Sequence, residues 1–195
     1  MVDSETRWRL VRRQKQRPMV SEAQEEIRAA RFEDLPAIKD IYNYFIRNTV
    51  ITFDDKPLDL HYWVELHQML HKLTLPFLVL TRGPEIIGFA FVQPWRQKSG
   101  YQKVVENSIY LQAPATGKKL GSKLLAELIA ECRKAGIKEV IAVIADRGAE
   151  ASIALHKKLG FAEQGHLAKV AVRFGKPIGS YLFSLTLRAM SDQPR

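Results

Sequence analysis

The segment from 104 to 121, VVENSIYLQAPATGKKLG, constrains the fold of this chain more than any other. Its first half, Val104 to Leu111, is rich in β-branched and aromatic residues, which predicts a buried strand that carries one carboxylate, Glu106. Its second half is a short loop that leads through Gly121 into the apolar face of a helix. Because the first amides of a helix lack internal partners and lie at the positive end of its dipole, this start favours an anion. The segment therefore predicts an enzyme that holds a phosphate-bearing cofactor beside a carboxylate able to remove a proton.

The size and composition of the chain fit one domain. It has 195 residues, of which 46% are hydrophobic, enough for a sizeable core. No apolar run approaches the roughly 20 residues that a membrane-spanning helix needs. The single cysteine, Cys132, excludes an internal disulfide and a CxxC metal site, and its place on the apolar side of a predicted helix indicates a core residue. A reducing, cytoplasmic setting is expected.

Positive charge is concentrated at the N-terminus. The chain carries a net charge of +9, and its first 20 residues contain six basic and two acidic side chains. This segment could be a nucleic-acid or membrane-surface arm, a targeting sequence, or a mobile extension without a role. We favour the last because the segment lacks a clean apolar face, so neither a nucleic acid nor a membrane is an expected partner. Residues 1–24 are predicted to be the extension, 25–190 the folded domain and 191–195 a C-terminal tail.

Apolar periodicity and turn residues give the order of the elements. Strands are predicted over 27–32, 76–80, 86–92, 104–111, 140–144, 163–172 and 180–187, and helices after Asp34, over 59–73, between Gly121 and Gly136, and over 151–158. Asp34 is expected to cap its helix, with Pro36 in the first turn. The continuous β-branched run of 140–144 predicts a strand covered on both faces. This order predicts a single α/β, or α+β, domain with a mixed sheet.

Several strings then occur in a familiar order and spacing. They are IYNYFIRNTVITF (41–53), QPWR (93–96), GYQKVVENSIYL (100–111), TGKKLG (116–121) and ASIALHKKLGF (151–161). Together they resemble the GNAT acetyltransferase superfamily, and within it the phosphinothricin acetyltransferase-like branch, over roughly 27–187. The resemblance implies a mixed, mostly antiparallel sheet of about seven strands with a splayed parallel pair, flanked by about four helices.

The resemblance also implies a function. It implies transfer of an acetyl group from acetyl-CoA to the primary amine of a small amino acid or analogue of the phosphinothricin or methionine sulfoximine kind, in a homodimer. The arm of the cofactor would lie between strands 104–111 and 140–144. There the backbone of Ile109, Tyr110 and Leu111 would bind the arm and polarise the thioester carbonyl, on which charge develops in the transition state.

Glu106 is the first catalytic candidate. An alkyl ammonium has a pKa near ~10, so at neutral pH it needs a base before it can attack a thioester. A carboxylate beside the amine can take that proton, directly or through water. The alternative is that Glu106 lies at a wet strand end and pairs with Lys103 or Arg96. The match of VENSIY to the family string favours catalysis.

The turn before the third helix is the predicted phosphate site, although it departs from the family pattern. Thr116 stands where relatives have Gln or Arg, and Lys119 where they have glycine. Lysine hinders close backbone approach to a pyrophosphate but adds positive charge. Ala149 replaces an asparagine that contacts the cofactor arm in relatives. The predicted cofactor-binding residues in this region are Thr116, Gly117, Lys118, Lys119, Leu120, Gly121 and Ser152.

His156, in LHKKLGF, is the second catalytic candidate. Many relatives have a tyrosine here that protonates the departing thiolate, and this branch commonly has histidine. Imidazole titrates near neutrality, so it can donate that proton. A lone histidine on a helix can equally be a packed or solvent-facing residue, and both interpretations stay open.

The acceptor site is the least constrained by sequence. Relatives carry a lysine, a tryptophan and an aspartate in the link between the last two strands, where this chain has Arg173, Pro177 and Gly179. A herbicide-type substrate therefore does not follow from the resemblance. The candidates are Arg96, Tyr101 and Arg173 for a substrate carboxylate, with Phe53 and Trp95 as apolar walls.

The sequence also leaves room for a metal site and for two other functions to be considered. His67 and His71 are spaced to clip a metal, but no third ligand accompanies them and no metal is expected. A peptide or protein N-terminal acetyltransferase is one alternative. Another is a non-catalytic member that binds acyl-CoA, or nothing, which the substitutions at Thr116, Lys119 and Ala149 would favour.

Overall fold

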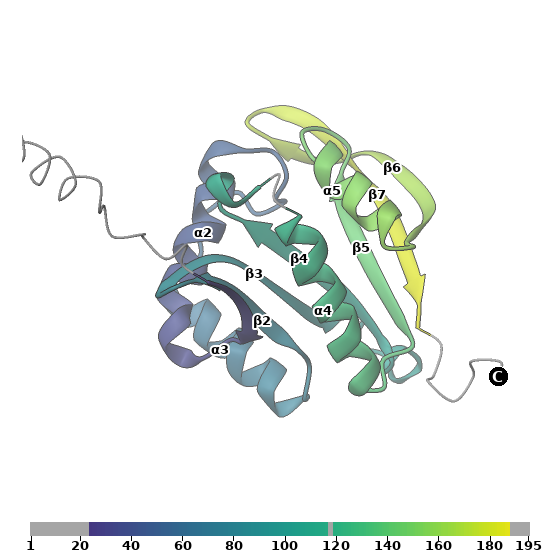
Figure 1. The fold of residues 1–195 in the computed structure, drawn as a ribbon. Helices are drawn as coiled ribbons and strands as arrows, with labels where there is room; N and C mark the ends of the chain where they lie inside the picture. The colour runs from purple at the N-terminus through teal and green to yellow at the C-terminus, as the bar shows by residue number, and fades with distance from the viewer. Residues whose placement is uncertain (1–23, 117–118, 188–195) are drawn as a thin grey trace, which may run out of the picture.

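The fold is seen in a computed structural model that describes residues 24–116 and 119–187 (Figure 1). The predicted N-terminal extension, apart from its last residue, and the predicted C-terminal tail lie outside the described residues, so these two boundaries stay predictions. The strands are β1 (Glu25–Ala29), β2 (Phe77–Arg82), β3 (Glu85–Pro94), β4 (Val104–Leu111), β5 (Glu139–Ala145), β6 (Ala162–Arg173) and β7 (Lys176–Thr186). The α-helices are α2 (Leu35–Asn48), α3 (Leu60–Lys72), α4 (Leu120–Lys134) and α5 (Glu150–Lys158).

All seven strands belong to one sheet, in the order β1-β2-β3-β4-β5-β7-β6. Every neighbouring pair is antiparallel except β4 and β5, which run parallel. This is the mixed sheet with one parallel pair that the resemblance implied, and that prediction is confirmed. Within the described part of the chain, no helix is long and apolar enough to span a membrane.

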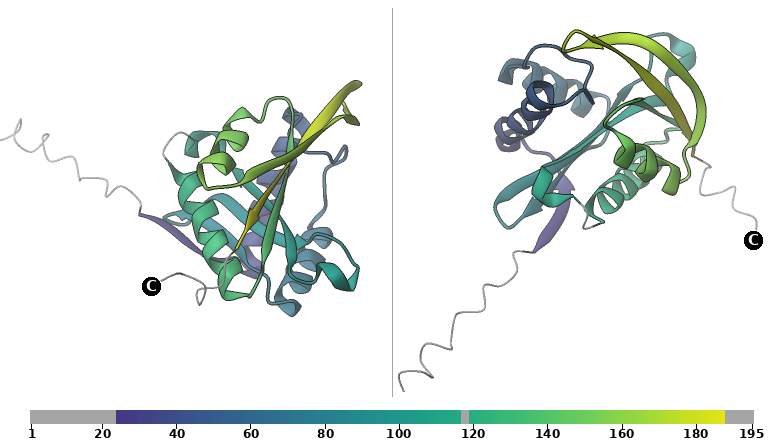
Figure 2. Two further views of the ribbon diagram at one scale, coloured as in Figure 1. Left: turned by 90° about the vertical axis from the view of Figure 1, so that its right-hand side faces the viewer. Right: turned by 90° about the horizontal axis from the view of Figure 1, so that it is seen from above.

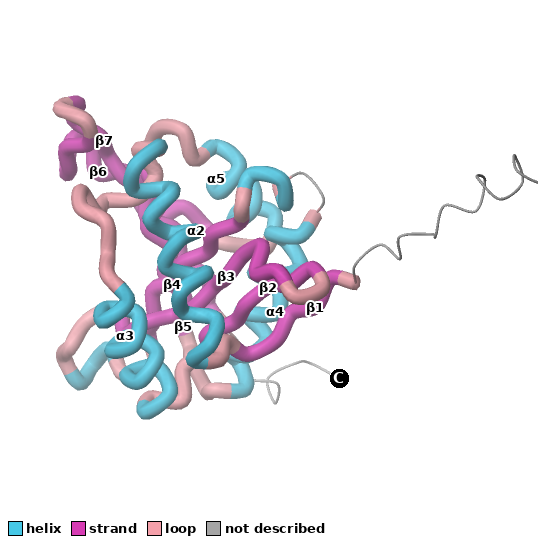
Figure 3. Tube along the Cα trace, turned by 90° about the vertical axis from the view of Figure 1, so that its left-hand side faces the viewer, coloured by secondary structure: helices cyan, strands magenta, loops and turns pink. Residues whose placement is uncertain are grey.

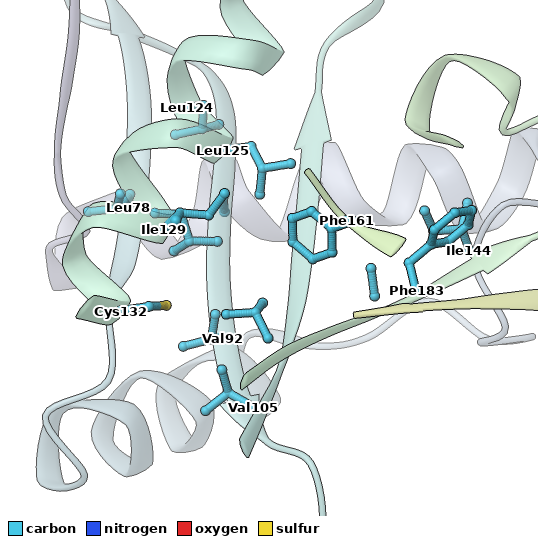
Figure 4. Packing of buried hydrophobic residues seen from close by; sticks show 14 of the residues in the cluster. Leu78, Val92, Val105, Leu124, Leu125, Ile129, Cys132, Ile144, Phe161 and Phe183 are labelled. Atoms are coloured by element: carbon cyan, nitrogen blue, oxygen red, sulfur yellow. The ribbon is translucent and has the colours of Figure 1, made fainter. Parts of the chain in front are cut away.

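Helices cover both faces of the sheet, with α2 and α3 on one face and α4 and α5 on the other (Figures 2 and 3). Successive side chains of a strand point to opposite faces, so β2 and β3 divide their apolar residues between two cores. Phe77 and Val79 join the core under α2 and α3, whereas Leu78 and Leu80 join the core under α4. Figure 4 shows the second core, in which Cys132 is fully buried, as predicted.

The strands β4 and β5 separate halfway along their length. Their pairing covers Val104↔Glu139, Val105↔Val140 and Glu106↔Ile141, and it ends there. Beyond Glu106, β4 stays paired with β3 on its other side as far as Leu111. The edges of β4 and β5 that face each other are therefore left without sheet partners in the second half of each strand.

The N-terminal elements differ from the sequence prediction. The first strand ends at Ala29, and Phe32–Asp34 forms a 3-10 turn. Asp34 does not cap α2 through its side chain, because its carboxylate accepts from the Arg28 guanidinium at 2.7 Å and from the Arg31 amide at 2.7 Å. Asp34 occupies the N-cap position of α2, as predicted, but its side chain makes no capping hydrogen bond, and Pro36 lies in the first turn, as predicted.

The face of β5 that points away from α4 is less covered than predicted. Val140, Ala142 and Ile144 are buried, but Ile141 and Val143 on the other face are half-buried. The reason is that α2 and α3 pack over β3 and the strands before it and do not extend across β5 (Figure 2).

The last two strands form one long hairpin. Arg173 pairs with Lys176, and the two residues between them, Phe174 and Gly175, both have positive φ (48° and 72°), as in a type I′ turn. Residues 173–179, predicted as a link, are therefore the end of one strand, a two-residue turn and the start of the next strand.

Candidate active site

A cavity of about 980 Å³ opens where β4 and β5 separate. Its lining comes from both faces of the sheet and from both separated strands. On one side it is bounded by α2, the α2–α3 connection and α3. On the other it is bounded by the start of α4, by Ala142–Ala145 of β5 and by α5. The splayed pair thus creates one continuous space that reaches from the start of α4 to the aromatic residues around α3.

The second half of β4 supplies side chains to both sides of this cavity. Strand alternation places Glu106, Ser108 and Tyr110 on one face of β4, which is directed toward α2 and α3. Asn107 and Ile109 point toward α4 and α5, where Asn107 contacts α5. These residues all line the cavity.

Glu106 is the last residue of β4 that pairs with β5, and its side chain is half-buried in the cavity wall. Burial raises the pKa of its carboxyl group above the ordinary value, and the nearby positive charge of Arg96 partly opposes this. Among the described residues, Glu106 forms no ion pair with Lys103 or Arg96. The arrangement fits a proton acceptor in the cavity better than a surface ion pair.

The start of α4 lies at the other end of the cavity. The first helical hydrogen bond runs from the Lys123 amide to the Lys119 carbonyl at 3.1 Å. The amides of Leu120 and Gly121 therefore have no partner within the helix, and both residues line the cavity. Such amides fit a phosphate.

The predicted phosphate turn is only partly available or described in the structure. The Thr116 amide and hydroxyl both donate to the Ala113 carbonyl, at 3.2 and 2.8 Å, so the predicted use of this amide for phosphate is not available in this arrangement. Gly117 and Lys118 lie outside the described residues. The described part of the predicted phosphate site is therefore limited to the amides from Lys119 onward.

Lys119 adopts a left-handed conformation, with φ 62° and ψ 8°, immediately before α4. This conformation costs a residue with a Cβ roughly 1–2 kcal/mol and glycine almost nothing. This backbone conformation explains why glycine is usual at this position in the family. In this chain the lysine strains the backbone but places a positive charge beside the predicted phosphates.

The strain at Lys119 leads to a prediction with a built-in control. Lys119→Gly should be more stable than Lys119→Ala by about 1 kcal/mol, because both remove the charge and only glycine relieves the backbone. Chemical denaturation measures this difference. Both variants should bind acetyl-CoA several-fold more weakly in low salt through loss of the charge. Equal stability of the two variants would contradict the assigned strain.

His156 is buried between α5 and β4, with 2% of its surface exposed. Its Nδ1 lies 2.8 Å from the Ser152 carbonyl, which can only accept, so Nδ1 carries the proton. Its Nε2 lies 3.0 Å from Nδ2 of Asn107, which donates to it. Burial also lowers the pKa of the imidazole. A neutral His156 in this arrangement has no free proton, so the predicted protonation of a thiolate would need an imidazolium that burial disfavours.

Sequence reasoning missed a polar cluster at the α2 and α3 side of the cavity. The Tyr42 hydroxyl donates to the carboxylate of Asp54, and Tyr42 packs edge-on against Trp63 and Tyr110. Burial, together with its neighbours, raises the pKa of the Tyr42 hydroxyl. Tyr42 and Tyr110 were present in two quoted strings, but Asp54 and Trp63 were in none. Nothing in the spacing of these residues indicated that Asp54 would meet a side chain of the preceding helix.

The loop that carries Asp54 is held by Asn43, a buried residue of α2. Its amide group donates to the Leu58 carbonyl and accepts from the Leu58 amide, both at 2.8 Å. These two bonds fix the α2–α3 connection against α2 and so position Phe53 and Asp54 at the cavity.

The predicted acceptor-site residues are only partly gathered at the cavity. Phe53 lines it. Trp95, Arg96 and Tyr101 do not, and the Arg96 guanidinium lies over the Trp95 ring at 4.6 Å. Their roles as wall and carboxylate ligands stay predictions.

Arg173 requires a correction. It is buried, with 3% of its surface exposed, and its guanidinium donates to the carbonyls of Ile46 and Thr49, at 2.5 and 3.4 Å. These carbonyls lie at the C-terminal end of α2, where a cation is favoured. Arg173 does not line the cavity, because its guanidinium is held by the carbonyls at the end of α2. It is a structural residue in this arrangement.

The histidines that suggested a metal clip do not form one. His67 lies beside the Ala30 carbonyl, at 3.3 Å. In residues 24–116 and 119–187, no group of three or more His, Cys, Asp or Glu side chains is placed to hold a metal ion.

Comparison with known proteins now adds a family to this geometry. The acetyltransferase (GNAT) family matches residues 38–161. Phosphinothricin N-acetyltransferase of Alcaligenes faecalis is 34% identical over 166 residues, which are 84% of this chain and 83% of the relative. L-methionine sulfoximine/L-methionine sulfone acetyltransferase of Pseudomonas aeruginosa is 33% identical over 169 residues, 86% of this chain and 98% of the relative.

A solved structure agrees with the fold. A putative acetyltransferase from Salmonella typhimurium, determined with its cofactor acetyl-CoA, superposes with a TM-score of 0.81 at 33% identity, over 84% of this chain and 94% of that one. The separated strands and the free amides of α4 are the features that fit such a cofactor here. The chain therefore belongs to the acetyltransferase (GNAT) family and is an acetyl-CoA-dependent N-acetyltransferase.

Proposed function

We propose that this protein transfers the acetyl group of acetyl-CoA directly to the primary amine of a small amino acid or analogue, with Glu106 as the base. The observation that carries the proposal is the position of Glu106. Its half-buried carboxylate lies in the cavity at the residue where β4 leaves β5. An amine placed at this point would meet the carboxylate and the separated strands together.

The chemistry of Glu106 supports this role. The attacking amine must lose a proton, and its ordinary pKa near ~10 leaves it protonated at neutral pH. A base works best when its own pKa is close to the working pH, and burial moves the pKa of Glu106 upward in that direction. Glu106 would hold the ammonium by hydrogen bond, take its proton and leave a neutral nucleophile.

The cofactor end has the groups that acetyl-CoA requires. When bound, acetyl-CoA supplies the activated acetyl group. The free amides of Leu120 and Gly121 and the charge of Lys119 would hold its phosphates. The unpaired edge of β4 at Ile109, Tyr110 and Leu111 would hydrogen-bond its arm, and Ser152 lines the same part of the cavity.

The class of acceptor is supported by the relatives. Those described above are named for phosphinothricin and for methionine sulfoximine and methionine sulfone, all small amino acids or analogues. We also propose a cytoplasmic homodimer. The dimer is supported by large apolar side chains left exposed on one hairpin, Leu167, Val170, Val172 and Phe174, which a second copy could cover.

The proposed function has a direct test. Purified protein with acetyl-CoA should release free thiol in the presence of small amines of the amino-acid class, and mass spectrometry should find the amine 42 Da heavier, the mass of an acetyl group replacing a hydrogen. Turnover of short peptides but of no free amine would favour a peptide acetyltransferase. Absence of calorimetric heat with acetyl-CoA would favour the non-catalytic alternative.

A further inference from the structure

The part of the cavity that would receive the acceptor can be defined by its elements. We call it the acceptor end, and it comprises the lining residues from α2, the α2–α3 connection, α3 and the face of β4 that carries Glu106. Its walls are aromatic, and they are formed chiefly by Tyr42, Phe45, Phe53, Tyr62, Trp63 and Tyr110.

Both charged side chains that line the described acceptor end are carboxylates, Asp54 and Glu106. The two lysines in the described lining are elsewhere, Lys119 before α4 and Lys158 at the end of α5. Asp54 and Glu106 are linked through two tyrosines: Asp54 accepts from the Tyr42 hydroxyl, and Tyr42 packs edge-on against Tyr110, which lies on the same face of β4 as Glu106. The charged side chains that line the described acceptor end therefore give it a net negative charge.

Neither of the two arginines predicted to hold a substrate carboxylate, Arg96 and Arg173, adds a positive charge to the lining of the acceptor end. Arg173 is buried against the end of α2, where its guanidinium donates hydrogen bonds to backbone carbonyls. Arg96 is exposed and lies over Trp95, outside the lining. Among the described residues Arg96 forms no ion pair with Glu106, although its positive charge partly opposes the rise in the pKa of the Glu106 carboxyl group that burial causes.

The side-chain hydrogen-bond donors that line the described acceptor end are uncharged. The indole nitrogen of Trp63 and the hydroxyl of Thr52 are buried and have no hydrogen-bond partner among the described residues. A neutral donor suits a carbonyl or hydroxyl oxygen, but it does not balance a buried negative charge. A carboxylate about 4 Å from a second carboxylate is repelled by several kcal/mol even at the effective dielectric of a protein surface. An ammonium, by contrast, is attracted by the carboxylates and by aromatic faces.

We infer that the preferred acceptor is a primary amine with an apolar or aromatic body and no free carboxylate, such as an arylalkylamine or an amino acid whose carboxyl group is neutralised as an amide. This inference rests on the proposed function, and it shifts the preferred acceptor from free amino acids to amines without a carboxylate. It follows from a cavity end that combines aromatic walls, two carboxylates and neutral donors.

A matched series of acceptors tests the inference. Phenylalanine, phenylalaninamide and phenethylamine share one ring and differ in the group beside the amine: a carboxylate, a neutral amide or hydrogen. With saturating acetyl-CoA, we expect kcat/KM for phenethylamine and for the amide to exceed that for phenylalanine by about tenfold or more, given the repulsion between like charges. Phenethylamine is more basic than phenylalanine, so its advantage could not come from a larger fraction of free amine.

Each contrary result has a distinct meaning. Faster turnover of phenylalanine than of phenethylamine, or turnover of phosphinothricin and methionine sulfoximine alone, would overturn the inference and leave the proposed function standing. Turnover of no amine and no amino acid would overturn both.

A pair of variants tests the origin of the preference. Asp54→Asn removes one charge from the acceptor end and should raise KM for phenethylamine about tenfold, while KM for phenylalanine stays level or falls. Asp55→Asn is the matched control, because Asp55 is the exposed neighbour and does not line the cavity. It should leave both values unchanged. An equal effect of Asp54→Asn on both acceptors would overturn the assignment of the preference to charge.

Discussion

Replacing Glu106 by glutamine is expected to lower kcat/KM at neutral pH by roughly 10²- to 10⁴-fold, the usual contribution of a positioned general base. The amide keeps the size of the side chain but cannot accept the ammonium proton. Binding of acetyl-CoA, measured by calorimetry, should stay unchanged because its proposed contacts lie on backbone and on α4. Glu139→Gln is the control, since Glu139 is a half-buried residue of β5 outside the cavity lining. Near-normal turnover by Glu106→Gln would remove Glu106 from the mechanism.

The pH dependence adds a second readout for Glu106. Burial raises its pKa above the ordinary 4.5, so kcat/KM of the unsubstituted protein should fall with decreasing pH on a limb displaced upward from that value. The same shift affects stability. A raised pKa means that the folded state binds the proton more tightly than the unfolded state, so the ionised carboxylate costs stability above the folded pKa and costs none below the unfolded one.

It follows that Glu106→Gln should be at least as stable as the unsubstituted protein at neutral pH, and that the difference should vanish toward pH 4. Thermal unfolding at several pH values measures this. A variant that loses activity while it gains or keeps stability has lost chemistry, whereas loss of both would indicate a damaged fold.

The parts of this fold that could be predicted from sequence are those fixed by local pattern. The apolar stripe of α4 has helical periodicity, and the runs at 104–111 and 140–144 are short and rich in β-branched residues, which favours strands. The expected role of Glu106 came from the match of VENSIY to the family string. The separation of β4 from β5 came from the resemblance alone, since no residue pattern marks where the parallel pairing ends.

The parts that could not be predicted depend on contacts between distant residues. Asp34 looked like a helix cap by its spacing, but Arg28 and the Arg31 amide bind its carboxylate instead. Asp54 reaches the cavity because the side chain of Asn43 clamps the backbone at Leu58. Such pairings have no signature in a single sequence, and they decide which charges line the acceptor end.

Arg173 gives the largest stability effect that we expect. Arg173→Ala should lower the free energy of unfolding by about 2–4 kcal/mol, because it leaves a cavity and strips the Ile46 and Thr49 carbonyls of a charged donor. The KM of the amine should not change in the folded fraction, since the guanidinium does not line the cavity. Urea denaturation and steady-state kinetics measure the two quantities. Lys176→Ala, which removes an exposed cation from the paired position of the same hairpin, should shift stability by less than about 0.5 kcal/mol. A raised KM with unchanged stability in Arg173→Ala would restore the carboxylate-binding role predicted from sequence and would show that the hairpin turns toward the cavity in the working enzyme.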